Sequence, residues 1–172
     1  NSGRRIFSCL KSDSMDKPLW GRRRDWWESG IEFTCLPGCG KCCDEPGGIV
    51  YLSREDARNL ADFHGLEVEE WLLRDCRKTI DGRYILKSRE VDEICIFLAD
   101  DKSCNVYSAK PAQCSAFPWW AENLRSERAW KKTEKLCPGL EHEDAILIDG
   151  KTIRLWVEAD LEATIGFRRW KN

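Results

Sequence analysis

Methionine, histidine and long apolar runs are scarce in this sequence. It has one methionine and two histidines in 172 residues. The longest apolar runs, such as 94–99, fall far short of the roughly 20 residues that cross a bilayer. The net charge is -2 although 34% of residues are charged, so the surface exerts no overall attraction on nucleic acid or anionic lipid. We therefore expect neither a membrane span nor a nucleic-acid-binding surface.

Glycosylation sites of the Asn-x-Ser/Thr type are absent as well. The ten cysteines make up about 6% of the chain, below the density of small disulfide scaffolds. Adjacent Cys42 and Cys43 would need two separate disulfide partners, because a bridge between neighbouring residues is strained. These features favour reduced thiols in an intracellular reducing compartment, either the cytoplasm or an organelle such as a chloroplast or mitochondrion, over secretion.

Four cysteines are concentrated within nine residues, in a segment that Pro37, Gly38 and Gly40 allow to turn sharply. Thiolates are preferred ligands of zinc and of iron–sulfur clusters. A C-x-x-C spacing lets two sulfurs reach one tetrahedral site. The first set comprises Cys35, Cys39, Cys42 and Cys43, and a second set, spread over the second half of the chain, comprises Cys95, Cys104, Cys114 and Cys137.

The grouping of these eight thiols stays open at the level of sequence. Two four-cysteine sites, or one cluster with spare thiols, are both consistent with the pattern. Cys42 and Cys43 could serve two metals or two corners of a cluster, or one of them could be an inert packed thiol. The second set could consist of buried structural thiols, an alternative nearly as strong as ligation for Cys95. Turn-rich surroundings favour ligation for Cys104, Cys114 and Cys137. Pro111 before Cys114 and Pro138-Gly139 after Cys137 fix turns whose N–H groups can point at a thiolate.

Hydrophobic periodicity and turn residues predict short helices and strands. Ser53 and Asp56 form a capping-box pattern at the start of a helix. We expect helices over 54–63, 68–78, 122–136 and 158–167, strands at 49–52 and 84–86, hairpins at 94–98 with 104–107 and at 145–148 with 152–157, and a short turn or helix around Cys114. The predicted fold is a small α+β, cysteine-rich metal-binding domain whose short helices and β-hairpins wrap around the metal site or sites.

The order and spacing of the motifs resemble the CxxCxxCC family, a zinc- or iron-chelating domain. The similar motifs span roughly 33–140 and are Phe33-Thr-Cys35, Cys39-Gly-Lys-Cys42-Cys43, Gly48 to Asp56, Cys95-Ile-Phe-Leu, Cys104-Asn-Val-Tyr107, Lys110-Pro-Ala-Gln-Cys114 with Phe117-Pro118, and Cys137-Pro-Gly139. The resemblance implies that the eight cysteines bind zinc or iron, the latter as a [4Fe-4S] cluster, and that Cys9 and Cys76 do not. The cysteine motif is also similar to that of a flagellin lysine methylase linked to an iron–sulfur cluster and S-adenosylmethionine.

Three positions depart from the family pattern. Cys35 and Cys39 are separated by three residues instead of two, which makes Cys35 the least secure ligand of its set. Lys110 replaces the usual arginine before proline, and Ser115 replaces a common basic residue. The last two changes weaken an anion-binding role, because lysine cannot form arginine's bidentate fork.

We expect three regions in the chain. Residues 1–30 form an N-terminal extension that is partly disordered or partner-binding, 31–142 the zinc- or iron-chelating domain, and 143–172 a C-terminal hairpin and short helix packed on it. Nine tryptophans are too many for one small core, so a Trp-rich surface for protein partners is expected. Its members are Trp20, Trp26, Trp27, Trp119 and Trp120.

No catalytic constellation stands out. There is no glycine-rich nucleotide loop after a strand. His64 is expected at a helix end and His142 in a solvated acidic turn. The favoured hypothesis is a non-catalytic, cysteine-ligated metal-binding protein acting as an accessory or assembly subunit of a larger complex. The alternative is an iron–sulfur or metal-dependent enzyme, methyltransferase-like or redox.

Overall fold

The computed structural model describes residues 24–171. Its elements are, in chain order, β1 (Ile31–Phe33), α1 (Arg54–His64), α2 (Val68–Asp75), β2 (Cys76–Lys78), β3 (Tyr84–Leu86), the 3-10 turn η1 (Tyr107–Ala109), α3 (Ala112–Ala116), α4 (Ala121–Leu124), α5 (Glu127–Leu136), the 3-10 turn η2 (Pro138–Leu140), β4 (Ile146–Ile148) and α6 (Gly150–Ile165). The strands form two antiparallel pairs, β1 with β4 and β2 with β3. The fold is therefore α+β, as expected. Within the described range no helix is long and apolar enough to cross a membrane.

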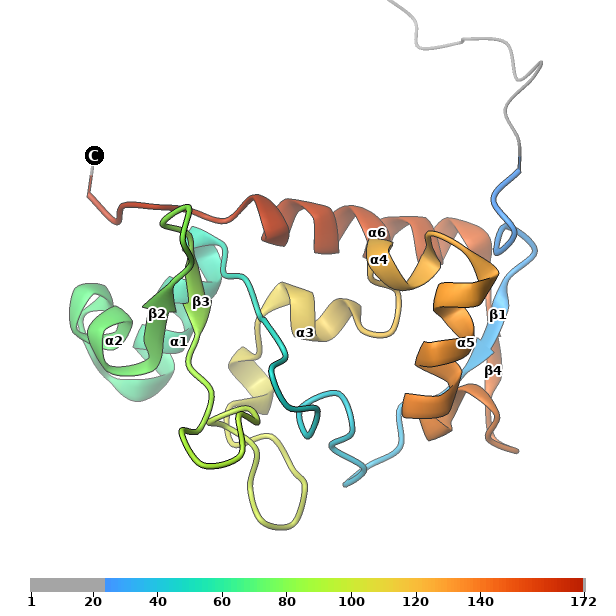
Figure 1. Ribbon diagram of the computed structural model, residues 1–172, viewed down its shortest axis with the longest axis horizontal. Coiled ribbons are helices and arrows are strands. Elements are labelled where there is room, and N and C mark those ends of the chain that lie inside the picture. Colours follow the sequence, from blue (N-terminus) through green and yellow to red (C-terminus); the bar gives the residue numbers. More distant parts are fainter. Residues whose placement is uncertain (1–23, 172) are drawn as a thin grey trace, which may run out of the picture.

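Helix α6 runs along one side of the molecule and links its two ends (Figure 1). At one end, α1, α2, β2 and β3 surround a buried cluster that includes Leu52, Leu60 and Trp71. At the other end, β1, β4 and α5 lie around a cluster that includes Trp130 and Ile153. Helix α3 packs against α6 between these ends. The irregular cysteine-bearing segments lie on the side of α3 away from α6 (Figure 1).

Helix α1 begins and ends where its local sequence predicts. The Ser53 side chain accepts a hydrogen bond from the Asp56 N–H, and the Asp56 carboxylate accepts one from the Ser53 N–H, which confirms the capping box. Gly65 ends the helix with a φ of 65°. The apolar spacing of this helix also predicts a buried Phe63, but its side chain is 46% exposed. The helical period places His64, four residues after Leu60, on the inner face instead.

The predicted C-terminal hairpin is wrong. β4 pairs with β1 in the register Ile31↔Ile148, and residues 150–165 form α6. Asp149 and Gly150, which resemble a hairpin turn in sequence, begin this helix. The Asp149 carboxylate accepts hydrogen bonds from the N–H groups of Lys151 and Thr152. Ile153, Asp160 and Ala163 recur at helical spacing and are buried.

Four further element predictions need correction. Residues 49–52 form only an isolated bridge, Tyr51↔Ile85, and 94–98 meets 104–107 only at Leu98↔Cys104. The second helix ends early because the chain enters β2 at Cys76. The helix expected over 122–136 is divided into α4 and α5, because Ser126 is extended and caps α5. The Trp130 side chain is buried and packs α5 against the core.

Two tryptophans of the predicted partner surface are core residues. Trp27 is 6% exposed and Trp119 is 3% exposed. Both belong to the cluster around Trp130, whose ring stacks on that of Trp119 at a centroid distance of 5.7 Å. Burial of such large rings is a major contribution to this end of the core. Of the other members of the predicted surface, Trp26 and Trp120 are half-buried and Trp20 lies outside the described residues.

Candidate metal centre

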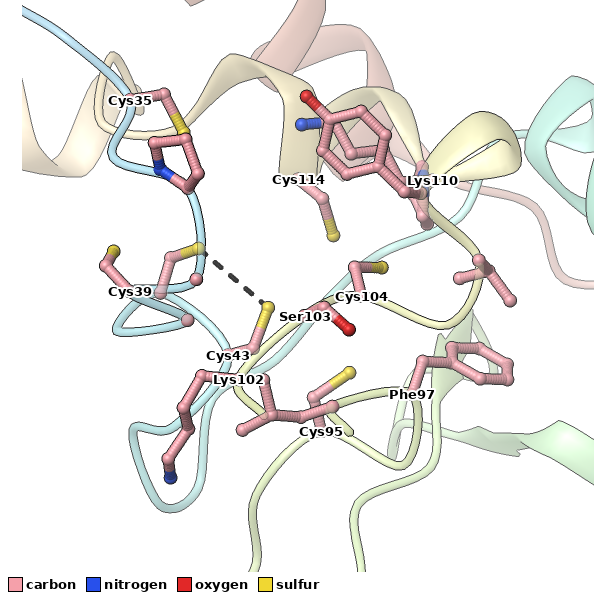
Figure 2. A pocket seen from close by; sticks show the side chains of 18 of the residues that line it. Cys35, Cys39, Cys43, Cys95, Phe97, Lys102, Ser103, Cys104, Lys110 and Cys114 are labelled. Atoms are coloured by element: carbon pink, nitrogen blue, oxygen red, sulfur yellow. Dashed lines mark hydrogen bonds between the residues drawn. The ribbon is translucent and has the colours of Figure 1, made fainter. Parts of the chain in front are cut away.

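Seven of the eight predicted metal ligands line one cavity of about 370 Å³ (Figure 2). These are Cys35, Cys39, Cys42, Cys43, Cys95, Cys104 and Cys114. The eighth, Cys137, lines an adjoining cavity of about 150 Å³ that shares four thiols with the first. Cys76 is instead buried in the hydrophobic cluster around Trp71, and Cys9 lies outside the described residues.

The first cysteine loop is held close to the turn at residues 99–103. Gly38 and Gly40 have φ values of 71° and 54°, which favour glycine. A Cβ on Gly40 would lie 2.7 Å from the backbone oxygen of Lys102. The Lys102 side chain reaches back to Asp44 with an Nζ–Oδ2 distance of 2.9 Å. Both contacts bring the first set of cysteines toward the second.

Backbone hydrogen bonds join the cysteine segments in two places. The Cys95 N–H donates to the Cys43 carbonyl at 3.1 Å, and the Thr34 N–H donates to the Gly139 carbonyl at 2.9 Å. At the second place the backbones approach so closely that a Cβ on Gly139 would lie 1.8 Å from the Thr34 oxygen. The chain therefore leaves β1 for Cys35 directly beside the segment that follows Cys137.

Helix α3, which carries Cys114, is positioned by buried polar side chains. The Asp56 carboxylate accepts a hydrogen bond from the Ala112 N–H at 2.9 Å. The Gln113 side chain accepts from the Tyr51 N–H at 2.7 Å and donates to the Asp160 carboxylate at 2.9 Å. The capping pattern in the sequence identifies Asp56 as part of the start of α1. No local sequence signal predicts its hydrogen bond to Ala112 of α3 or the pairing of Gln113 with Asp160.

Three neighbouring thiols, Cys42, Cys43 and Cys95, shift one another's pKa. The Cys42 and Cys43 sulfurs are 3.8 Å apart. The hydrogen bond from Cys43 lowers the pKa of Cys42 to about 7, and the same donor lowers the pKa of Cys95 to about 6. The pKa of Cys43 is raised in turn, first by its bond to Cys42 and then by its bond to Cys95. The thiolate form is therefore favoured at Cys42 and Cys95 over Cys43.

Backbone N–H groups point at several of these sulfurs. The pKa is lowered at Cys95 by the N–H of Phe97, at Cys104 by that of Val106 and at Cys137 by that of Gly139. The Leu98 N–H donates to the Cys95 carbonyl. Burial nevertheless raises the pKa of Cys104 and Cys137. Such donors stabilise a metal-bound thiolate, and the one at Gly139 lies in the turn that the sequence indicates.

Lys110 is the principal cation beside the thiols. It lines both cavities, and its Nζ lies 4.7 Å from the centroid of the Tyr107 ring. Burial raises the pKa of the Cys35 and Cys114 thiols, and the positive charge of Lys110 partly offsets this rise. A fixed positive charge here favours thiolate over thiol and therefore favours metal binding.

The two histidines lie outside the thiol cavities. His64 ends α1, with its Nε2 3.8 Å from Asp75, and its pKa is lowered by burial and by Arg74. His142 is half-exposed beside Asp144. Neither residue lines the cavities with the cysteines.

The donor set fits zinc or iron by its chemistry. Among the described residues, both cavities are lined by thiols and by no carboxylate or imidazole, which is the soft environment that these metals take. In residues 24–171 no three potential ligands yet converge closely enough to hold an ion. Binding would therefore draw the sulfurs together.

The family model described as "Putative zinc- or iron-chelating domain" matches residues 34–138, more than half of the chain. The matched range begins one residue before Cys35 and ends one residue after Cys137. No solved structure matches the chain.

Proposed function

The chain belongs to the CxxCxxCC family of zinc- or iron-chelating domains, and on this premise we propose that its eight clustered cysteines are the metal ligands. We further propose that the metal-loaded domain is a non-catalytic accessory or assembly subunit of a larger complex. The observation that carries the ligand assignment is the gathering of eight thiols, from positions 35 to 137, on two adjoining cavities.

The role of the metal in this proposal is to connect chain segments. A zinc ion held by four cysteines leaves no open position and acts as a structural cross-link, whereas an iron–sulfur cluster can also carry an electron. In this proposal the thiols of the chain are the ligands, and its backbone N–H groups and Lys110 favour the thiolate form that binds metal. Reduced thiols of this kind suit a reducing compartment, the cytoplasm or an organelle.

The partner surface of an accessory subunit must differ from the predicted Trp set, because Trp27 and Trp119 are buried. Exposed apolar side chains occur instead on β4 and α6, at Ile146, Leu147 and Leu155. We propose that the cysteine-bearing unit extends over 31–142, and that a protein partner contacts the β4–α6 side. Native mass spectrometry of the chain with its cellular partners tests the accessory role, and a chain that stays monomeric in every preparation contradicts it.

A second candidate function is a metal-dependent enzyme, methyltransferase-like or redox. It is favoured by a cavity of about 680 Å³ lined by Tyr51, Gln113 and Trp120. A further small cavity, lined by Trp120 and Cys43 among others, shares residues with this cavity and with the thiol cavity. A substrate there would lie beside the metal site, so saturable binding of S-adenosylmethionine that Trp120→Ala abolishes would support the enzyme over the accessory subunit.

Anaerobic purification followed by metal analysis and visible absorption tests metal binding. An iron–sulfur cluster gives a brown protein absorbing near ~400 nm, and zinc gives a colourless one. Cys104→Ser is expected to lower the metal content, whereas Cys76→Ala, outside both cavities, is the matched control and should retain it. A wild-type chain that holds neither metal after anaerobic reconstitution would contradict the proposal.

A further inference from the structure

We propose that the eight cysteines divide into two separate four-thiol sites. The inner site consists of Cys43, Cys95, Cys104 and Cys114, and the outer site consists of Cys35, Cys39, Cys42 and Cys137. This division rests on the proposed metal binding and states how the ligands are shared. Four thiolates are the full ligand set of a structural zinc ion or of a [4Fe-4S] cluster.

The inner site is assembled from neighbouring backbone segments. The Cys95 N–H donates to the Cys43 carbonyl, and Cys104 forms a bridge with Leu98, three residues after Cys95. In Figure 2 the sulfurs of these three cysteines face the space into which Cys114 points from α3. None of the three lines the smaller cavity that contains Cys137.

The outer site is formed around the smaller cavity. Cys35, Cys39 and Cys42 line the smaller cavity together with Cys137, and Cys137 does not line the larger one. The hydrogen bond from Thr34 to Gly139 holds the two ends of this site together. In Figure 2, Cys35 and Cys39 lie at the left, and the inner-site residues Cys95, Cys104 and Cys114 lie to their right.

Four cysteines, Cys35, Cys39, Cys42 and Cys114, line both cavities, and the assignment of Cys42 and Cys114 decides the division. Cys42 follows Cys39 at the C-x-x-C spacing that directs two sulfurs to one metal, so it belongs to the outer site. Cys114 points from α3 into the space that the inner-site sulfurs face (Figure 2), so it belongs to the inner site, and Cys137 lines the smaller cavity and not the larger one. Adjacent Cys42 and Cys43 therefore serve different sites, which explains why the sequence places them side by side.

The division is tested on the reduced, metal-free, full-length wild-type protein with Zn²⁺ as the probe. Native mass spectrometry during a zinc titration is expected to show two ions per chain at saturation. At one equivalent of zinc, alkylation followed by peptide mapping should show the thiols of one site protected together, with Cys42 and Cys43 reacting differently. A single zinc per saturated chain, or equal protection of Cys42 and Cys43 at one equivalent, overturns the division while leaving metal binding intact.

Matched variants provide a second measurement. Cys137→Ser and Cys104→Ser should each reduce the zinc capacity from two ions to one, and Cys76→Ala should keep two. If a serine variant fails to fold, the alkylation map of the wild type still shows whether Cys42 and Cys43 belong to different sites. Reconstitution with iron and sulfide is scored in the same way, with two clusters expected and a single cluster contradicting the division. Absence of both metals from the wild type would instead contradict the proposed function.

Discussion

At the scale of single residues, close backbone contacts decide where the cysteines lie. Gly139 has no side chain to separate its segment from Thr34, and Gly40 allows the loop to approach Lys102. Their role is to let two segments approach more closely than a Cβ permits.

Gly139→Ala should destabilise the protein by about 3 kcal/mol, because the new Cβ meets a backbone oxygen that can move only with its strand. Urea unfolding of the metal-free protein measures the change. Gly48→Ala is the control: its Cβ would come no closer than 3.4 Å to another atom, so a change below about 1 kcal/mol is expected. Equal midpoints for the two variants would contradict the steric argument.

His64 should make the fold sensitive to mild acid. Its folded pKa is lower than the ordinary 6.5 because burial and Arg74 disfavour the charged form. As pH falls through 6.5, the unfolded chain therefore binds more protons than the folded one, and stability declines. Above this range the contribution vanishes because His64 is neutral in both states.

The comparison that isolates this effect is wild type against His64→Gln, both metal-free and reduced. Thermal melting between pH 7.5 and pH 5 should decline less steeply for the variant, because glutamine does not titrate. The thiols that titrate in the same range are common to both proteins. Parallel pH profiles would show that His64 does not contribute.

At the scale of elements, α3 is too short to be stable alone and depends on its neighbours. Pro111 precedes it, the Asp56 carboxylate binds its first N–H, and Gln113 connects it to Asp160 of α6. The orientation of Cys114 is therefore set by α1 and α6 together. The same polar contacts explain why these buried carboxylates are tolerated, since each is hydrogen-bonded.

Asp56→Ala should destabilise the protein by about 3 kcal/mol, because it leaves the N–H groups of Ser53 and Ala112 without their partner. Denaturant unfolding gives the magnitude, and the zinc capacity should fall as α3 loosens. Asp62→Ala, on the exposed face of the same helix, should change stability by less than about 0.5 kcal/mol. Similar losses of stability in both variants would contradict the role of the Asp56 hydrogen bonds, because Asp62 does not contact α3 through them.

At the scale of the whole molecule, the proposed metal connects segments from residue 35 to residue 137. The two hydrophobic clusters are linked mainly through α3 and α6. Metal bound to the cysteine segments would add connections on the opposite side of α3, so metal affinity would contribute to folding stability.

Cys42→Ser should therefore lose part of the stability that metal adds. The quantity to measure is the difference in melting temperature between metal-loaded and metal-free samples of each protein. This difference should be smaller in Cys42→Ser than in wild type and unchanged in Cys76→Ala, even if both variants melt lower overall. An undiminished metal-dependent gain in Cys42→Ser would contradict a ligand role for that thiol.

The sequence by itself determined the features that arise over a few residues. The capping box at Ser53, the helix stop at Gly65 and the α+β class follow from local spacing and backbone preference. The family follows from the motif pattern as well, and its model matches 34–138. These signals are read correctly because they depend on neighbours in the chain.

Only the tertiary structure decided which distant segments meet. β4 pairs with β1 instead of with 152–157, and Trp27 is buried by residues that lie about a hundred positions away. Asp149-Gly150 suits both a hairpin turn and a helix start, so its role depends on whether the following apolar face finds a partner in α3. The gathering of the cysteines has the same cause, because backbone contacts between separate loops bring them to shared cavities.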